Sequence, residues 1–176
     1  VQRVVARYGE PVDTPFAALT HLFPSAQALA EADPEVIGKL GIVRQRVGAI
    51  RALSEAVVSG SLQLHRGADL HTTLQQLKAL PGVGDWTAQV IAMRALAWPD
   101  AWPASDIGLM NALGSRDPKQ LTAQAEAWRP WRAYAVMQLW HHLETTWEAA
   151  ATVGPSGAMP STAVEAAAAA TVMELK

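Results

Sequence analysis

The chain has 176 residues, half of them hydrophobic, and a formal net charge of −2. This length suffices for one core of ordinary size but is short for two independent domains, so we expect one compact domain and a tail. Cysteine is absent, which excludes disulfides, thiolate metal sites and cysteine-bound iron–sulfur clusters.

The sequence contains no apolar run of the ~18 residues that a membrane span needs, and its first residues lack the layout of a signal peptide. We therefore expect a soluble, cytoplasmic protein with no membrane partner. The near-neutral charge argues against a broad basic surface for nucleic acid. The negative excess lies in the last stretch, however, and residues 1–147 are formally neutral. A phosphate site made of backbone amides therefore stays open.

Helical spacing with capping residues recurs along the chain without sustained apolar–polar alternation, which predicts an all-α fold. After a frayed start over residues 1–8, Ser25 and Asp33 are predicted N-caps, and Gly60 closes a longer amphipathic helix. The helices expected in this first half are Pro15–Leu22, Ala26–Ala30, Pro34–Lys39, Val43–Ser59 and, after the cap Asp69, Leu70–Ala79.

In the second half, helices are predicted at Asp85–Ala97, at Ile107–Leu113, from Pro118, and from Pro130 or Trp131 to Trp147. A loop with Trp98-Pro99 and Trp102-Pro103 precedes Ser105-Asp106, because proline disfavours a helix interior. Residues 1–147 are thus expected to form the helical domain. Residues 148–176 are rich in alanine and are expected to be disordered or a loosely attached helix.

The most particular string in the sequence joins two predicted helices and reads Leu80-Pro81-Gly82-Val83-Gly84-Asp85-Trp86-Thr87-Ala88. Its two glycines allow a tight turn and a close approach to another molecule. The following helix begins with unsatisfied amides, which suit a phosphate. A helical hairpin that binds nothing is the alternative for a bare Gly-x-Gly.

The full string resembles the helix-hairpin-helix of the DNA glycosylase superfamily that also carries a Gly/Pro-rich loop and a catalytic aspartate. The resemblance covers roughly residues 1–144. It implies an all-α glycosylase domain whose DNA-binding residues are Gly82, Val83, Gly84, Trp86 and Thr87. In that family, hairpin amides hold a phosphate of duplex DNA, often beside a monovalent cation bound by hairpin carbonyls.

The resemblance also implies a catalytic carboxylate about twenty residues beyond the hairpin, and Asp106 stands there. Taken by itself, an aspartate before an apolar helical run is most often an N-cap, and the two roles are compatible. A helix N-terminus stabilises an anion, and an anion can stabilise the sugar as it turns cationic during cleavage of an N-glycosidic bond. Ser105 is a candidate to support it.

Trp86 stands where strand-nicking members of the superfamily place a lysine, which implies hydrolysis of the base without lyase activity. The stretch from Ala127 to Ala135, followed by Trp140, resembles the last helix of the bacterial 3-methyladenine DNA glycosylase II (AlkA) type. In that type, residues matching Trp86 and Trp140 line the pocket of the flipped base. Their indole faces favour a cationic alkylated purine by ~0.5–2 kcal/mol.

The other aromatic and basic residues of that stretch are expected to be structural. Trp128 and Trp131 are interpreted as core or solvent-edge aromatics, and Trp140 could equally be one. Arg129 and Arg132 are expected at the surface or beside a phosphate.

The chain also departs from the family. It lacks the upstream wedge and the β-rich subdomain of the AlkA type, so the domain reads as incomplete at its amino end. Two pocket positions that are often aromatic are Ile107 and Val90 here, which leaves the range of damaged bases open. Asp85 occupies a hairpin position where a basic or neutral residue would suit a phosphate better.

No metal site is predicted, because the five histidines show no ligand spacing with a nearby carboxylate. The first functional hypothesis is a monomeric, nucleoid-associated bacterial enzyme of base-excision DNA repair that removes alkylated purines such as 3-methyladenine without an organic cofactor or iron–sulfur cluster. The alternatives are a helix-hairpin-helix DNA-binding module without activity and, less favoured, a merely structural helical domain.

Overall fold

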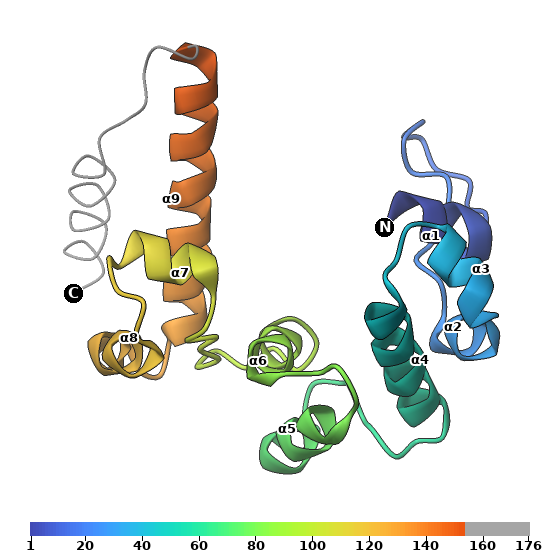
Figure 1. Ribbon diagram of the computed structural model, residues 1–176, viewed down its shortest axis with the longest axis horizontal. Helices are drawn as coiled ribbons and strands as arrows, with labels where there is room; N and C mark the ends of the chain where they lie inside the picture. Colours follow the sequence, from blue (N-terminus) through green and yellow to red (C-terminus); the bar gives the residue numbers. More distant parts are fainter. Residues whose placement is uncertain (154–176) are drawn as a thin grey trace. The chain divides into compact units, whose positions relative to one another are not determined.

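The computed structural model describes the backbone of residues 1–153 and the side chains of residues 1–145. Over this part, helices are the regular elements, with one isolated bridge between Pro11 and His21, so the all-α expectation is confirmed. The chain divides into two compact units, Val1–Gly84 and Asp85 onward, whose elements are labelled in Figure 1. Within the described residues, no helix is both long and apolar enough to cross a membrane.

The first unit packs its small core around α4. Ile37 of α3 and Val47 of α4 are almost fully buried there together with Ala32. Ser25 and Asp33 cap their helices as predicted, accepting amide hydrogens from Ala28 at 3.1 Å and from Glu35 at 2.8 Å. The helices of this unit are α1 (Gln2–Tyr8), α2 (Ala26–Glu31), α3 (Pro34–Lys39), α4 (Arg44–Val58) and α5 (Leu70–Ala79).

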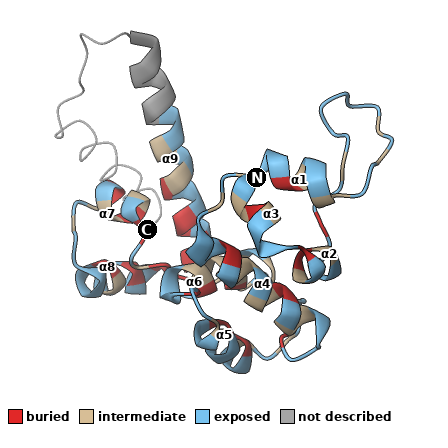
Figure 2. Cartoon of the chain, turned by 45° about the vertical axis from the view of Figure 1, so that its right-hand side comes forward, coloured by how far each residue is buried: buried red, intermediate tan, exposed pale blue. Residues whose placement is uncertain are grey.

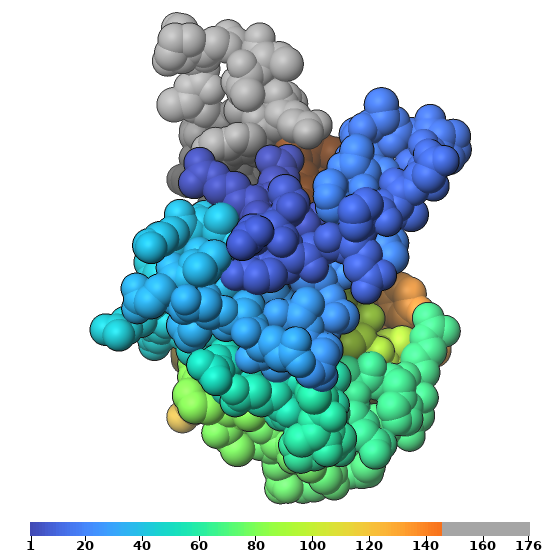
Figure 3. Space-filling model, turned by 90° about the vertical axis from the view of Figure 1, so that its right-hand side faces the viewer, coloured from blue at the N-terminus to red at the C-terminus, as the bar shows by residue number. Residues whose placement is uncertain are grey.

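Two expectations for the first unit were wrong. Residues 1–8 were expected to be frayed, but α1 forms and buries Val4. The helix predicted at Pro15–Leu22 is replaced by a turn that projects from the unit in Figures 2 and 3. The Thr14 hydroxyl lies 3.0 Å from both the Phe16 and the Leu19 carbonyl oxygens, and donation of its one hydrogen there offers the backbone an alternative to a helix. Phe16 and Leu19 are exposed, so no core packing favours the helix.

The second unit contains the larger core and, as shown below, the candidate site. Helix α7 packs against α9, and the buried side chains of both join Trp102 and Trp128 in one cluster. The two indole rings meet edge to face, with centroids 5.9 Å apart. The helices are α6 (Asp85–Arg94), α7 (Ile107–Ala112), α8 (Pro118–Ala125), the 3₁₀ turn η1 (Glu126–Trp128) and α9 (Arg132–Val153).

Two predicted boundaries in this unit were also wrong. Helix α6 ends at Arg94 rather than near Ala97, which adopts a left-handed conformation with φ 55°. Helix α9 continues past Trp147 to Val153, so residues 148–153 of the predicted tail are helical. The remainder of that tail, residues 154–176, lies outside the described residues.

Candidate active site

Asp106 caps the short helix α7 at the end of the proline-containing loop. Its backbone is extended, with φ −70° and ψ 126°, and its Oδ1 accepts the Leu109 amide hydrogen at 2.9 Å. The residue is only 9% exposed. The N-cap role that the sequence predicts is therefore confirmed. Because the carboxylate is nearly buried, each hydrogen bond to it is electrostatically stronger than it would be in water.

Two tryptophan side chains converge on the same carboxylate. The Trp86 indole N–H, from α6, donates to Oδ2 at 2.7 Å, and the Trp140 indole N–H, from α9, donates to Oδ1 at 3.0 Å. Three helices of the second unit thus bring together the three residues that the sequence predicts to take part in the reaction. Their sequence separations are 20 and 34 residues.

All the hydrogen-bond donors described around Asp106 are neutral. They are one backbone amide and two indoles. Among residues 1–145, none of the identified ion pairs includes Asp106. Within the described residues, the carboxylate is thus oriented by neutral donors, which suits a group that must respond to a cation forming in a substrate.

Gly108, which was not predicted from the sequence, makes room for this arrangement. A Cβ added at Gly108 would lie 2.9 Å from Asp106 Oδ1 and 3.4 Å from Trp140 Cδ1. A glycine two residues after the cap and inside a helix is the signal that could have revealed it, because glycine is otherwise disfavoured there.

The buried carboxylate lies close to solvent-exposed residues. Trp86 is 42% exposed, and Ile107, the first residue of α7, is 67% exposed. Val90, on the next turn of α6 after Trp86, is half-buried. The site therefore combines a shielded anion with an accessible indole and apolar side chains.

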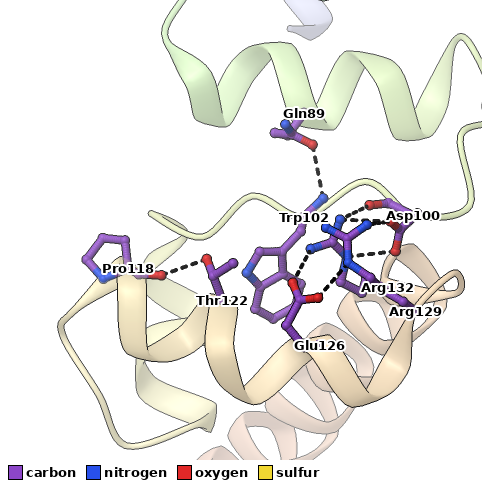
Figure 4. Close-up of polar contacts among 8 residues, drawn as sticks. All are labelled: Gln89, Asp100, Trp102, Pro118, Thr122, Glu126, Arg129 and Arg132. Atoms are coloured by element: carbon purple, nitrogen blue, oxygen red, sulfur yellow. Dashed lines mark hydrogen bonds and ion pairs between the residues drawn. The ribbon is translucent and has the colours of Figure 1, made fainter. Parts of the chain in front are cut away.

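The loop before Asp106 is held by a second carboxylate, Asp100, as Figure 4 shows. Arg132 donates to both Asp100 carboxylate oxygens, through Nε at 2.7 Å and Nη2 at 2.8 Å, and to its carbonyl at 3.0 Å. Arg129 adds a bond of 2.6 Å and also pairs with Glu126. On the other side of the loop, the Gln89 side chain accepts the Trp102 amide hydrogen at 3.0 Å.

This cluster corrects the expected role of one arginine. Arg132 was expected at the surface or beside a phosphate, but its side chain is 6% exposed and pairs with an Asp100 side chain that is 8% exposed. Arg129 is half exposed, as expected. Trp128 is in the core and Trp131 at the surface, in agreement with their structural interpretation.

The predicted phosphate-binding loop ends the first unit. Gly82 has φ 79°, and a Cβ added there would lie 2.9 Å from the Ala49 Cβ. The fold therefore requires a glycine at position 82. Gly84 has an ordinary φ and no neighbour within 4 Å of an added Cβ. Val83 is buried, and its amide donates to the Leu80 carbonyl at 3.1 Å.

Helix α5, which leads into this loop, is fixed at its start by Asp69. The Asp69 carboxylate accepts the Thr72 amide hydrogen at 2.8 Å. Hydrogen bonds from the Thr72 side chain and amide lower the pKa of Asp69, so this cap is an anion at neutral pH. Beyond the loop, Trp86 and Thr87 occupy the first turn of α6 in the second unit.

Comparison with known proteins gives curated relatives of one kind, although no family model matches the chain. A Mycobacterium tuberculosis protein named probable bifunctional transcriptional activator/DNA repair enzyme AlkA is 49% identical over 146 residues, which are 81% of this chain and 29% of that protein. Escherichia coli DNA-3-methyladenine glycosylase 2 is 33% identical over 139 residues, 79% of this chain and 49% of that protein. The chain thus spans less than half the length of these relatives.

Solved structures agree on the fold. A 3-methyladenine DNA-glycosylase from Archaeoglobus fulgidus matches with a TM-score of 0.68 at 19% identity, over 80% of this chain and 49% of that one. An 8-oxoguanine glycosylase/lyase from Clostridium acetobutylicum matches with a TM-score of 0.63 at 17% identity, over 78% and 50%. At these identities the likeness concerns architecture.

The helical architecture, the Gly-x-Gly hairpin sequence and the curated relatives together place the chain in the helix-hairpin-helix class of DNA glycosylases. Within that class, the two curated relatives are more specific. The chain belongs to the AlkA type of DNA-3-methyladenine glycosylases.

Proposed function

We propose that the protein removes alkylated purines of the 3-methyladenine kind from duplex DNA by hydrolysing the N-glycosidic bond. One observation carries this proposal: Asp106 is a buried carboxylate that receives three neutral hydrogen bonds and lies beside a half-exposed indole. The names of its relatives support the substrate class.

The proposed chemistry follows from the charge that develops on the sugar. As the bond between C1′ and the base nitrogen breaks, its electron pair leaves with the base and the sugar becomes an oxocarbenium-like cation. The anionic Asp106 stabilises that cation in a site of low dielectric constant. Water then adds to C1′ and loses a proton, which leaves an abasic sugar. The reaction as written needs water and no cofactor.

The damaged base must leave the duplex stack before C1′ can approach Asp106. Trp86 offers an accessible indole beside the carboxylate, and stacking on an indole face favours a cationic base by ~0.5–2 kcal/mol. A methylated purine that carries a positive charge is also a better leaving group. Both effects favour alkylated over normal purines.

We further propose that the reaction stops at the abasic site. Strand cleavage through a Schiff base requires an amine at the sugar, and position 86 supplies an indole instead. One structural neighbour is a glycosylase/lyase, so fold does not decide between the two chemistries. Treatment of the reaction with borohydride should therefore trap no covalent complex between the protein and DNA.

Duplex DNA is proposed to bind through backbone amides of Gly82, Gly84 and Trp86, with Val83 and Thr87 contributing to the same stretch. Amides read phosphate rather than base identity, so binding should be largely independent of sequence. This explains how a protein with a net charge of −2 could bind DNA without a broad basic surface.

The test is release of free base from duplex DNA that carries 3-methyladenine or 7-methylguanine, with undamaged duplex as the control. We expect release from the damaged duplex and intact strands until alkali is added. Binding to duplex DNA with no base release would instead identify a DNA-binding module without catalytic activity, and absence of both would leave a structural domain.

A further inference from the structure

We infer that Trp86 and Trp140 are positioning residues that hold the Asp106 carboxylate by their indole N–H groups, in addition to any contact that their ring faces make with a base. The role of that carboxylate rests on the proposed function. The hydrogen bonds to the carboxylate do not depend on the proposed function, and the experiments below test the hydrogen bonds and the function separately.

The two tryptophans hold different oxygens of the carboxylate. Trp86 donates to Oδ2, whereas Trp140 donates to Oδ1, which also accepts the Leu109 amide hydrogen. A single cap bond from Leu109 would fix one oxygen and leave the carboxylate free to turn about its Cβ–Cγ bond. A separate donor on each oxygen sets the plane of the group. Positioning at this level matters because small misplacements of a reacting group cost orders of magnitude in rate.

Other tryptophans of the second unit do not make such contacts. The indole nitrogens of Trp102 and Trp128 are buried in the core and have no hydrogen-bond partner within the described residues. Trp131 is more than half exposed at the start of α9. Convergence of two other indole N–H groups on one carboxylate is therefore a specific arrangement.

An independent observation at Gly108 supports the same arrangement. The position lies inside α7, where alanine would be the better helix former. A Cβ there would crowd Asp106 Oδ1 at 2.9 Å and also contact Trp140 Cδ1 at 3.4 Å. The absence of a side chain at position 108 thus keeps the carboxylate and the Trp140 ring within hydrogen-bonding distance of each other.

The choice of indole as a donor has an electrostatic consequence. An arginine or lysine in either place would also orient the carboxylate, but its positive charge would offset the negative charge that the reaction needs. An indole N–H donates and carries no charge. The two tryptophans therefore fix the geometry of Asp106 and leave its charge for the substrate.

The first experiment tests the hydrogen bonds on the whole chain without DNA. In a ¹H–¹⁵N spectrum, the seven tryptophans give seven indole N–H signals, and Trp86→Phe and Trp140→Phe assign two of them. In Asp106→Ala, we expect these two signals to move upfield and their hydrogens to exchange faster with water. The signal assigned by Trp131→Phe serves as the matched control and should stay in place.

The second experiment tests the function of the contacts with ligands that carry no base, so that stacking on a base plays no part. It compares affinity for duplex DNA with a cationic pyrrolidine in place of one sugar against DNA with a neutral tetrahydrofuran there. We expect wild type to prefer the cation. Trp86→Phe and Trp140→Phe should each reduce that preference by roughly tenfold, the size of one hydrogen bond to a charged group, while Trp131→Phe keeps it.

A double variant distinguishes action through Asp106 from a general loss of structure. Adding Trp86→Phe to Asp106→Asn should reduce the preference no further, because residues that act through one group are not additive. The inference is overturned if both phenylalanine variants keep the wild-type preference, or if Asp106→Ala leaves both indole signals unmoved. A wild-type protein without any preference or base release would instead refute the proposed function, and the indole signals would still decide whether the tryptophans hold Asp106.

Discussion

Asp100 and Asp106 lie on one loop of the second unit, six residues apart, and both are nearly buried, yet their surroundings are opposite. Asp100 forms ion pairs with the guanidinium groups of Arg132 and Arg129, which compensate its negative charge. Asp106 receives hydrogen bonds from two indoles and an amide, which carry no charge. One carboxylate is neutralised by the protein, and the other is oriented but not neutralised.

One loop can therefore be both rigid and reactive. A buried ion pair stabilises its surroundings only while both partners are present, so Asp100 with Arg132 fixes the path of the loop. A buried anion without a cationic partner is costly, and neutral donors repay part of that cost. The remaining cost is relieved when a cation forms beside Asp106, which is the event that the proposed reaction requires.

The largest effect on stability is expected from Arg132→Met, which leaves Asp100 buried without its principal partner. Breaking a buried pair from one side costs about 3–5 kcal/mol, and unfolding in urea would measure it. Arg51→Met is the control, because Arg51 pairs with Glu55 at the surface, with side chains 46% and 52% exposed. That variant should lose less than about 1 kcal/mol. Equal losses in the two variants would show that the Asp100 cluster does not hold the loop.

The sequence was most informative where the structure depends on neighbouring residues. The caps at Ser25, Asp33, Asp69 and Asp106 follow from short polar side chains before apolar runs, and all four accept an amide hydrogen from the first turn of their helix. The resemblance to a family then added Trp86 and Trp140, which spacing by itself could not relate to Asp106. Whether these residues act on DNA stays a prediction.

What the sequence did not predict depends on distant contacts. The burial of Arg132 follows from a partner 32 residues away in a loop, and no local pattern indicates it. The turn around Phe16 has enough apolar residues for a helix but nothing to pack against. The space that Gly108 leaves becomes visible only when α9 brings Trp140 beside it.

A second variant, Gly108→Ala, would disturb the geometry of Asp106 without changing its charge. The added Cβ must displace the carboxylate, whose Oδ1 it would approach to 2.9 Å, so base release should fall by about 10²-fold, the cost of a misplacement near 1 Å. Gly48→Ala, inside α4 and with open space at its Cβ, is the control. It should gain up to about 1 kcal/mol from helix propensity and keep full activity. Base release by Gly108→Ala at the wild-type rate would contradict the proposed geometry.

The two hairpin glycines are expected to differ in role: Gly82 contributes to stability and Gly84 to DNA binding. Gly82→Ala should lose about 1–2 kcal/mol of stability, because its φ is positive and a Cβ would crowd Ala49. Gly84→Ala meets no neighbour and should unfold like wild type. If Gly84 approaches a phosphate, that variant binds every duplex more weakly, by roughly tenfold, whatever its sequence. Unchanged affinity of Gly84→Ala, measured by fluorescence anisotropy, would remove this glycine from the interface.

The smallest effect is expected at Ala97, just before the loop that carries both carboxylates. Its φ of 55° is unfavourable for alanine, and glycine there should stabilise the protein by about 1 kcal/mol. Base release should not change, because the Asp100 cluster already fixes the loop downstream. A gain in thermal stability with a large loss of activity would show that the strain at Ala97 contributes to the site.

The different roles of the two carboxylates can be tested with a matched pair, Asp100→Asn and Asp106→Asn, each measured for unfolding in urea and for release of 7-methylguanine. Asp100→Asn removes the charge that Arg132 needs and should lose about 3 kcal/mol of stability, with base release per folded molecule falling far less than in Asp106→Asn. Asp106→Asn keeps most of the capping ability and should change stability by less than about 1 kcal/mol, while base release falls by about 10²–10³-fold. The opposite pattern, or wild-type base release by Asp106→Asn, would contradict the division between the two carboxylates and leave Asp106 as an ordinary helix cap.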